Sequence, residues 1–333
     1  MRSNTEITGG LGTRVSEERR FRLFLIANVL IGFGTCVDSS AFNNYLREIY
    51  HLDVTQRTLL EFPRETPGFL VFIFMGMLSG LGDVRIAAIA QIITGLGMFS
   101  LGVIPPEYAV MLACVFFYST GIHLYLPLTN SIGMSFARDG KVGRKLGEIS
   151  AANTVALVSG SAILLILFRF FKLSFMLAFS LGACVFVAAG VMLFCMGREK
   201  PSNLKQRFVF RKEYRLYYWL SVLYGARKQI FITFAPWVIV DVFKQPVTTM
   251  TLLFFIVSVL GIAVKPLIGR LIDTAGERFT LGCEALILIC VCLLYAFAAD
   301  IFPASVALVV VCICYVIDQC STSVSMARAT YMR

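Results

Sequence analysis

The chain has 333 residues, of which 58% are hydrophobic and 15% are charged, and its mean hydropathy is +0.79. So few polar residues cannot cover a water-soluble particle of this size, which excludes a soluble globular protein. The formal net charge is +10, and basic loops at an anionic membrane surface explain it without a nucleic-acid partner. We therefore expect a protein that is surrounded by membrane lipid and binds no nucleic acid.

Apolar stretches long enough to cross a bilayer follow one another along nearly the whole chain. A membrane-spanning helix needs about 20 apolar residues, whereas barrel strands alternate apolar and polar residues over about 10, so the pattern predicts an all-α polytopic protein. Residues 1–20 lack the apolar core of a cleavable signal peptide, so we expect the first span to be retained. The ten predicted spans cover residues 22–44, 58–80, 86–104, 108–136, 147–168, 173–196, 215–242, 250–271, 279–299 and 303–326.

Lys and Arg residues are concentrated in the connections on one side of the predicted membrane. The N-terminal arm and the connections after the fourth and the sixth span are rich in them, and helix parity places all three on the same side. Because basic loops stay in the cytoplasm, we expect a cytoplasmic N-terminus, with the protein in a bacterial plasma membrane.

Two stretches that lie 193 residues apart resemble each other and indicate an internal duplication. Thr58–Leu60 is repeated as Thr251–Leu253, and Gly76 as Gly269. Two complete copies of six helices make twelve, so the second repeat is incomplete, and we expect the intact protein to extend to roughly 390 residues. The predicted domains are an N-terminal six-helix bundle with a cytoplasmic arm over residues 1–196, a basic cytoplasmic linker over 197–213, and the first four helices of the C-terminal bundle over 214–333.

The end of the eighth predicted span carries a short motif of glycines and charges. Gly269 is followed by Asp273, Gly276 and Arg278 in a loop before the next span. Glycine at both flanks lets two helices approach closely, and Asp273 can accept from helix N-terminal amides or pair with Arg278. The pattern suits a hinge on the cytoplasmic side.

This motif resembles the signature of the major facilitator superfamily, which the chain also resembles in topology, duplication and basic linker. The first-half copy falls on residues 76–85, where the acidic position is Gly80 and the carboxylate is displaced to Asp83, close to Arg85. We expect an altered salt bridge there. The resemblance implies two six-helix bundles that rock about a central site, with alternating access driven by an ion gradient or by the substrate's own gradient. The predicted cytoplasmic gate consists of Gly269, Asp273, Gly276, Arg278, Asp83 and Arg85.

Ionisable residues inside the spans are the candidates for function, because a charge in hydrocarbon costs from about 2.5 to more than 10 kcal/mol. Glu61, Arg64 and Glu65 on the second span have uncharged counterparts in the second repeat, and their spacing allows Glu61 to pair with Arg64. Asp38 on the first span lies at a comparable depth. We predict a network of Asp38, Arg64 and Glu65 in which Asp38 or Glu65 exchanges the coupling proton.

The second half supplies further charges at similar depth. We expect the solute to bind Arg227 and Lys228 on the seventh span, Asp318 on the tenth and His123 on the fourth. The alternative is that these charges only pair with one another and hold helices together, and a lone His among Tyr residues is more often a packing residue. Further polar residues that serve either the solute or helix packing are Asn43, Asn44, Asn130, Asn153 and Gln229.

The predicted function is transport of a small anionic or polar solute by alternating access, with a proton as the expected coupling ion. One alternative is a multidrug-type efflux antiporter, which is disfavoured because the fourth span carries His123 in place of a permanently charged base and the fifth span has no proline. Another is a transport-derived membrane sensor, because fold does not fix function. No catalytic motif, metal-ligand spacing or phosphate-binding loop occurs, so we expect no enzyme, no cofactor and no metal. The ten cysteines lie in apolar spans, where they act as small hydrophobes.

Overall fold

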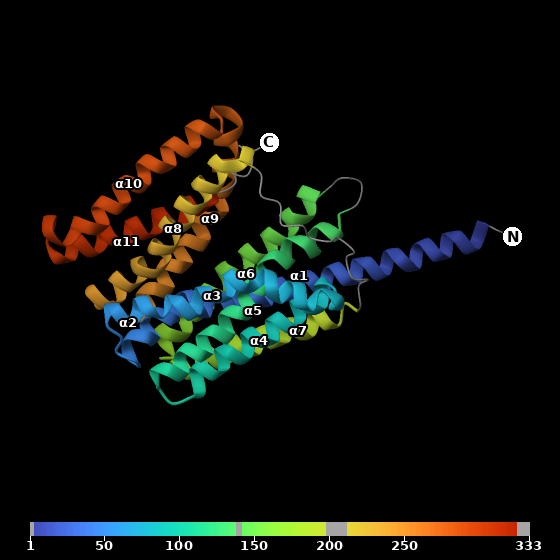
Figure 1. Cartoon of the computed structure of the whole chain (residues 1–333), viewed down its shortest axis with the longest axis horizontal. Coiled ribbons are helices and arrows are strands. Elements are labelled where there is room, and N and C mark those ends of the chain that lie inside the picture. Colours follow the sequence, from blue (N-terminus) through green and yellow to red (C-terminus); the bar gives the residue numbers. More distant parts are fainter. Residues whose placement is uncertain (1–2, 138–141, 198–211, 325–333) are drawn as a thin grey trace.

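The computed structural model describes residues 3–137, 142–197 and 212–324, and this part of the chain is helical without any strand (Figure 1). The all-α prediction is confirmed, whereas most of the predicted linker, 197–213, lies outside the described residues. The N-terminal helices are α1 (Ser3–Glu48), α2 (Val54–Leu59), α3 (Glu61–Leu78), α4 (Asp83–Val103), α5 (Tyr108–Ser135), α6 (Val142–Phe170) and α7 (Phe175–Phe194). The C-terminal helices are α8 (Arg215–Trp237), α9 (Val247–Ala275), α10 (Glu277–Ile301) and α11 (Ala304–Ser321). Short helical segments are η1 (Ser79–Leu81), η2 (Lys212–Tyr214), the π-helix η3 (Val238–Val242) and η4 (Thr322–Val324).

Eight of the described helices are long and apolar enough to cross a membrane, which makes this an integral membrane protein. The other two long helices are α3, which carries Glu61, Arg64 and Glu65 in its first turns, and α8, which carries Arg227 and Lys228 near its middle. One predicted span, 58–80, is divided at Leu60 into α2 and α3. Pro63 causes this change, because it has no N–H to donate to the carbonyl of Leu59.

The N-terminal helices pack around two apolar cores. We call the side of the membrane on which α1 begins the near side, and the side on which it ends at Glu48 the far side. α4 packs against α5 and α7, α1 packs against α6 and α7, and α3 packs against α5. One core surrounds Tyr45 and Phe179 toward the far side, and the other surrounds Phe24 and Leu193 toward the near side. These contacts hold α1, α3 and α5 at fixed positions around the space between them.

The close approach of α4 and α5 depends on a glycine. A Cβ atom at Gly121 would lie 2.2 Å from Oγ1 of Thr94 and 2.3 Å from the carbonyl oxygen of Ala90. We expect Gly121→Ala to lower the free energy of unfolding by about 1–3 kcal/mol, because the two helices must move apart. The melting temperature in detergent measures this, with Gly282→Ala as the control, since no atom lies within 4 Å of a Cβ there. Equal melting temperatures for the two variants would contradict the prediction.

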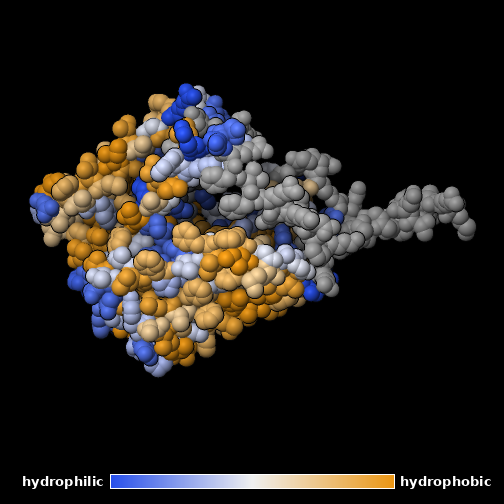
Figure 2. All heavy atoms as spheres, viewed as in Figure 1, coloured by the Kyte–Doolittle hydropathy of each residue, from blue (hydrophilic) through white to orange (hydrophobic). Residues whose placement is uncertain are grey.

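The C-terminal helices contact the N-terminal helices on the far side. α9 packs against α6 and α1, and the side chain of Trp237 is buried in the far-side core of the N-terminal helices. Arg47 Nε lies 3.7 Å from Asp241 Oδ1, and Asn44 Nδ2 donates to the carbonyl oxygen of Gln245 at 3.0 Å. Figure 2 shows apolar side chains along the helices and hydrophilic ones in the hollow between the two groups of helices. The far side is therefore closed by contacts between the two parts of the chain.

The predicted gate motif lies on helices and not in a loop. α9 continues through Asp273 to Ala275, and α10 begins at Glu277, so only Gly276 joins the two helices. Gly276 has a φ of +82°, which glycine adopts without a steric penalty. Gly82, with a φ of +80°, has the same position before α4. Gly82 and Gly276 stand 194 residues apart, which is one residue more than the 193-residue sequence repeat. The segments before them also differ, because the one before Gly82 ends in the 3-10 turn η1 whereas α9 remains α-helical.

Candidate functional site between the two halves

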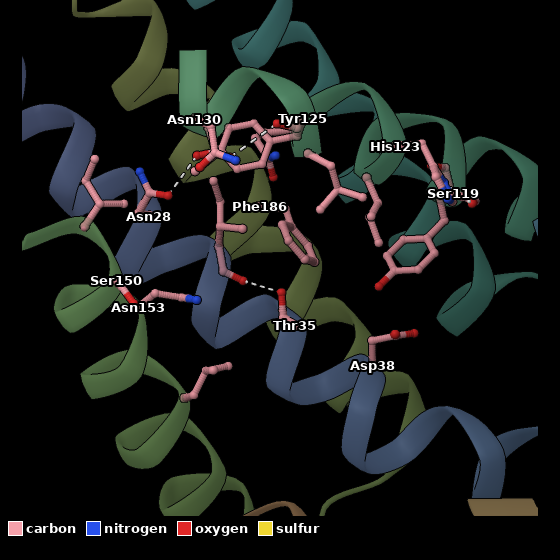
Figure 3. Close-up of a pocket in the computed structure, with 18 of the residues that line it drawn as sticks. Asn28, Thr35, Asp38, Ser119, His123, Tyr125, Asn130, Ser150, Asn153 and Phe186 are labelled. Atoms are coloured by element: carbon pink, nitrogen blue, oxygen red, sulfur yellow. Dashed lines mark hydrogen bonds between the residues drawn. The ribbon is translucent and has the colours of Figure 1, made fainter. Parts of the chain in front are cut away.

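A cavity of about 590 Å³ lies among the N-terminal helices and extends from Asp38, deep on α1, to Asn28 nearer the near side (Figure 3). Side chains from α1, α3, α4, α5, α6 and α7 line it, and many of them are polar. Four residues singled out as ionisable candidates lie on this lining, namely Asp38, Arg64, Glu65 and His123, together with Asn130 and Asn153.

Glu65 on α3 connects the two halves of the protein. Gln229, on α8, donates through Nε2 to Glu65 Oε1 and to Glu61 Oε2, and both distances are 3.0 Å. His123 Nε2, from α5, lies 3.6 Å from the other Glu65 oxygen, Oε2. The Glu65 carboxylate is thus contacted by a helix of each half at the same time.

The contacts of His123 determine where its hydrogen lies. Nδ1 is 3.0 Å from both the hydroxyl and the carbonyl oxygen of Ser119. The Ser119 hydroxyl donates to the carbonyl of Arg64, so both Ser119 oxygens can only accept from the imidazole. Nδ1 therefore carries a hydrogen. At 3.6 Å, Nε2 and the Glu65 carboxylate attract each other only when one further proton is bound to the pair. That proton resides either on the imidazole or on the carboxyl group.

Arg57 and Arg64 surround the second carboxylate, Glu61. Arg57 Nη1 donates to Glu61 Oε1, and Arg64 Nη1 lies 3.5 Å from the same oxygen. The Arg57 side chain has no solvent exposure, and its Nη2 lies 3.4 Å from the carbonyl oxygen of Thr233 on α8. Asn43 is a further partner, at 3.4 Å from Nη2. Glu61 is therefore held by two cations, one of which also contacts the second half.

Sequence reasoning did not identify Arg57. It immediately precedes the predicted span 58–80, where a basic residue is expected to belong to a connecting loop. The spacing between Arg57, Glu61 and Glu65 is the feature of the sequence that could have identified it. Residues four apart lie on one face of a helix, and Arg57, Glu61 and Glu65 follow that spacing. A charge in this row is more consistent with a buried network than with a solvated loop.

Asp38 completes the charged group on the first half. It interacts electrostatically with Arg64, and it lies close to Tyr118 on α5. The guanidinium of Arg64 also lies 5.5 Å from the centre of the Phe42 ring. The structure therefore places Asp38 and Arg64 together, whereas Glu65 contacts His123 and Gln229 and interacts with this pair through the charge of Arg64.

The predicted substrate residues of the second half form a separate group. Arg227 Nη1 on α8 donates to Asp318 Oδ1 on α11, and the charge of Lys228 also acts on Asp318. None of the three lines the cavity described above, although His123 does. The Nε and Nη2 atoms of Arg227 are buried and have no hydrogen-bond partner among the described residues. Arg227 therefore has one bonded edge and one open edge.

The predicted gate residues lie on the near side, at the ends of α9 and α4. Asp273 is exposed and forms no ion pair within the described ranges. Asp83 accepts a hydrogen bond from the Ser131 hydroxyl at 2.5 Å, and in the described part of the chain it has no ion pair with Arg85. On the near side, Asp273 is thus exposed to solvent, whereas Asp83 is held by Ser131.

The described residues contain neither a disulfide nor a cluster of metal-ligating side chains. The ten cysteines are free thiols. Within the described ranges, no group of three or more His, Cys, Asp or Glu side chains converges as a metal site would require. The interactions that the structure shows at the site are hydrogen bonds and ion pairs.

Comparison with known proteins identifies the fold. The Major Facilitator Superfamily profile matches residues 24–332. The nucleoside transporter NupG has a similar structure, with a TM-score of 0.72 at 13% identity over 94% of this chain and 82% of NupG. A bacterial homologue of the human lysosomal transporter Spinster gives 0.65 at 16% identity, over 95% of this chain and 77% of that chain. The xylose transporter XylE from E. coli gives 0.56 at 14% identity, over 95% and 84%. No curated protein sequence matches.

The family profile, the membrane-length helices and the similar structures together indicate a secondary transporter. The sequence motif of glycines and charges pointed to the same family. Because the profile covers nearly the whole chain, the protein belongs to the Major Facilitator Superfamily.

Proposed function

We propose that the protein is a proton-coupled transporter of a small polar solute that works by alternating access in a bacterial plasma membrane. In this proposal residues 1–196 and 214–333 form two bundles joined by the linker 197–213. The basic N-terminal arm makes the near side cytoplasmic. With the far side closed and the cavity extending toward the near side, the described structure then corresponds to an inward-facing state.

The pair of Glu65 and His123 supports proton coupling, and it is the observation that carries the proposal. Because Nδ1 of His123 already donates to Ser119, the contact between Nε2 and Glu65 holds exchangeable hydrogen in a cavity on the near side. A carboxylate and an imidazole that share a proton can release it when the partner or the solvent changes. In a membrane interior such a pair is costly, which favours a functional role over a purely structural one.

The contacts across the two halves support alternating access. Gln229 on α8 binds Glu61 and Glu65 on α3, and Asn44 on α1 binds the backbone of Gln245. All of these bonds join one half to the other, so the far side can open only if they break. Rocking of one bundle against the other exchanges these contacts for new ones, as alternating access requires.

The polar side chains of the site favour an uncharged or zwitterionic solute. Arg57 and Arg64 are balanced by Glu61 and Asp38, and Arg227 is balanced by Asp318. The open Nε and Nη2 edge of Arg227 matches a planar group with two adjacent acceptors, such as a nucleobase edge or a carboxylate. Guanine nucleosides carry such an edge at O6 and N7. Transporters named for nucleoside and for xylose share this fold, so both solute classes are candidates.

Transport into proteoliposomes tests the proposal. The purified protein is reconstituted, and uptake of radiolabelled guanosine and D-xylose is followed with and without an inside-alkaline pH gradient. We expect accumulation of a solute of one of these classes above its external concentration, and its loss when a protonophore is added. Liposomes without protein are the control. A solute that binds but shows no counterflow would indicate a transport-derived sensor and contradict the proposal.

A further inference from the structure

Two rows of side chains face each other across the boundary between the two halves. Arg57, Glu61 and Glu65 stand four residues apart along α2 and α3, and Gln229, Thr233 and Trp237 stand four residues apart along α8. The two helical rows run in opposite directions. The contacts are made in order: Trp237 and Thr233 meet Arg57, and Gln229 meets both Glu61 and Glu65.

The far-side end of these rows is a closed contact. The Arg57 side chain is fully buried, its Nη2 is 3.4 Å from the carbonyl of Thr233, and its guanidinium carbon is 5.9 Å from the centre of the Trp237 ring. Trp237 itself is only 2% exposed. Arg57, Thr233 and Trp237 therefore form what we call the far-side gate.

We propose that Gln229 is a positioning residue that makes the far-side gate respond to the proton on Glu65. The proposal rests on the proposed function only in taking Glu65 as the proton site. A Gln amide nitrogen carries two hydrogens, and here each points to a different carboxylate. The nitrogen is thus a bridge whose strength depends on the charge of both carboxylates.

The physical reason is the strength of hydrogen bonds to ions. Bonds to a charged acceptor are roughly twice as strong as bonds between neutral groups, so a proton on Glu65 weakens one of the two bonds that hold α8 to α3. Gln229, Thr233 and Trp237 lie on one face of a single helix, so a displacement at Gln229 also moves the two gate residues. The 3.4 Å contact between Arg57 and Thr233 is long and is lost first. Protonation deep in the cavity thereby opens the far side.

Several charged groups surround Glu65 and affect the strength of its hydrogen bond to Gln229. His123 on α5 contacts Glu65 directly, and Arg64 precedes it on α3. Glu61 shares Gln229 with it, Arg57 binds Glu61, and Asp38 on α1 acts on Arg64. Because acid would protonate several of these groups, the neutral variant Glu65→Gln is a cleaner test than a change of pH.

The chain contains its own reporter for the gate. It has two tryptophans, the buried Trp237 and Trp219, which is 62% exposed. In a Trp219→Phe background, quenching of the remaining tryptophan by acrylamide measures access to the gate in detergent. We expect Glu65→Gln to raise the quenching constant at least about twofold, because it converts a buried indole into a solvent-accessible one. In the presence of Gln229→Met, the same Glu65→Gln change should produce no further increase.

Matched variants make the outcome decisive. Gln91→Met removes an amide from the cavity that Glu65 lines, without touching α8, and should leave the quenching constant of Trp237 unchanged. Gln229→Asn keeps an amide that is one methylene too short to bridge both carboxylates, so it replaces Gln229→Met should that variant not fold. An equal effect of Glu65→Gln with and without Gln229 overturns the proposal, and so does the absence of any effect. The Trp219→Phe protein can show proton-driven uptake while the quenching constant of Trp237 is unchanged by Glu65→Gln. In that case only this inference fails and the transport function stands.

Discussion

Replacement of Glu65 by glutamine is expected to abolish uptake driven by a pH gradient while solute counterflow continues. Glutamine keeps the size of the side chain and an acceptor for Gln229, but it cannot exchange a proton with His123. For the exchange of one proton, a gradient of one pH unit supports about tenfold accumulation, because each unit is worth about 1.36 kcal/mol. The variant is expected to bring the solute only to equal concentrations on both sides.

Accumulation of radiolabelled solute in proteoliposomes at a fixed pH gradient measures this effect. The matched control is Glu107→Gln, which removes the same charge from an exposed residue before α5 and should accumulate solute as the unmodified protein does. Full accumulation by the Glu65→Gln protein would remove Glu65 from proton coupling and leave Asp38 as the other predicted carrier.

Replacement of Arg227 is expected to weaken solute binding by a factor of about 10 to 100, because each hydrogen bond to a charged group contributes about 1.5–3 kcal/mol. Arg227→Ala also leaves Asp318, whose side chain is 3% exposed, without its ion-pair partner. Unpairing a buried charge costs about 3–5 kcal/mol of stability, so loss of binding in that variant alone is ambiguous. Arg227→Lys resolves this, since it keeps the charge beside Asp318 and removes the open Nε and Nη2 edge.

Isothermal titration of the transported solute, combined with the melting temperature of each variant, measures this effect. Arg270→Lys, an exposed exchange of the same kind on α9, is the control and should bind normally. If a folded Arg227→Lys protein bound solute as tightly as the unmodified protein, the open edge of Arg227 would not belong to the solute site.

The position of the ionisable residues along the chain allowed part of the site to be predicted. Asp38, Arg64, Glu65 and His123 were selected because charges in the centre of apolar spans are expensive, and the structure places all four on one cavity. Which of them touch was not predictable. His123 was expected to be a packing residue as readily as a functional one, and only the neighbouring α3 brings Glu65 within 3.6 Å of it.

The motif around Gly276 shows that a local sequence pattern can predict the family correctly and the local backbone structure incorrectly. Its four residues correctly indicated the family, but the expected loop is helical up to Ala275. We expected the glycines of the motif to flank the end of a helix. Gly269 instead lies inside α9. A glycine within a long apolar helix costs only about 1 kcal/mol, so the helix continues through it. The positive φ of Gly276 and Gly82 marks the true breaks.

By itself, the amino-acid sequence determined the membrane environment, the helical fold, the family and the depth of each charge. These properties depend on the hydropathy and spacing of residues that are close together in the sequence, so they can be read from short windows along the chain. Tertiary structure alone decided that Arg57 is buried, that Arg227 pairs with Asp318, and that Gln229 bridges two carboxylates. Gln229 stands 164 residues from Glu65 in the chain, and such a contact exists only because the folded halves bring α8 against α3.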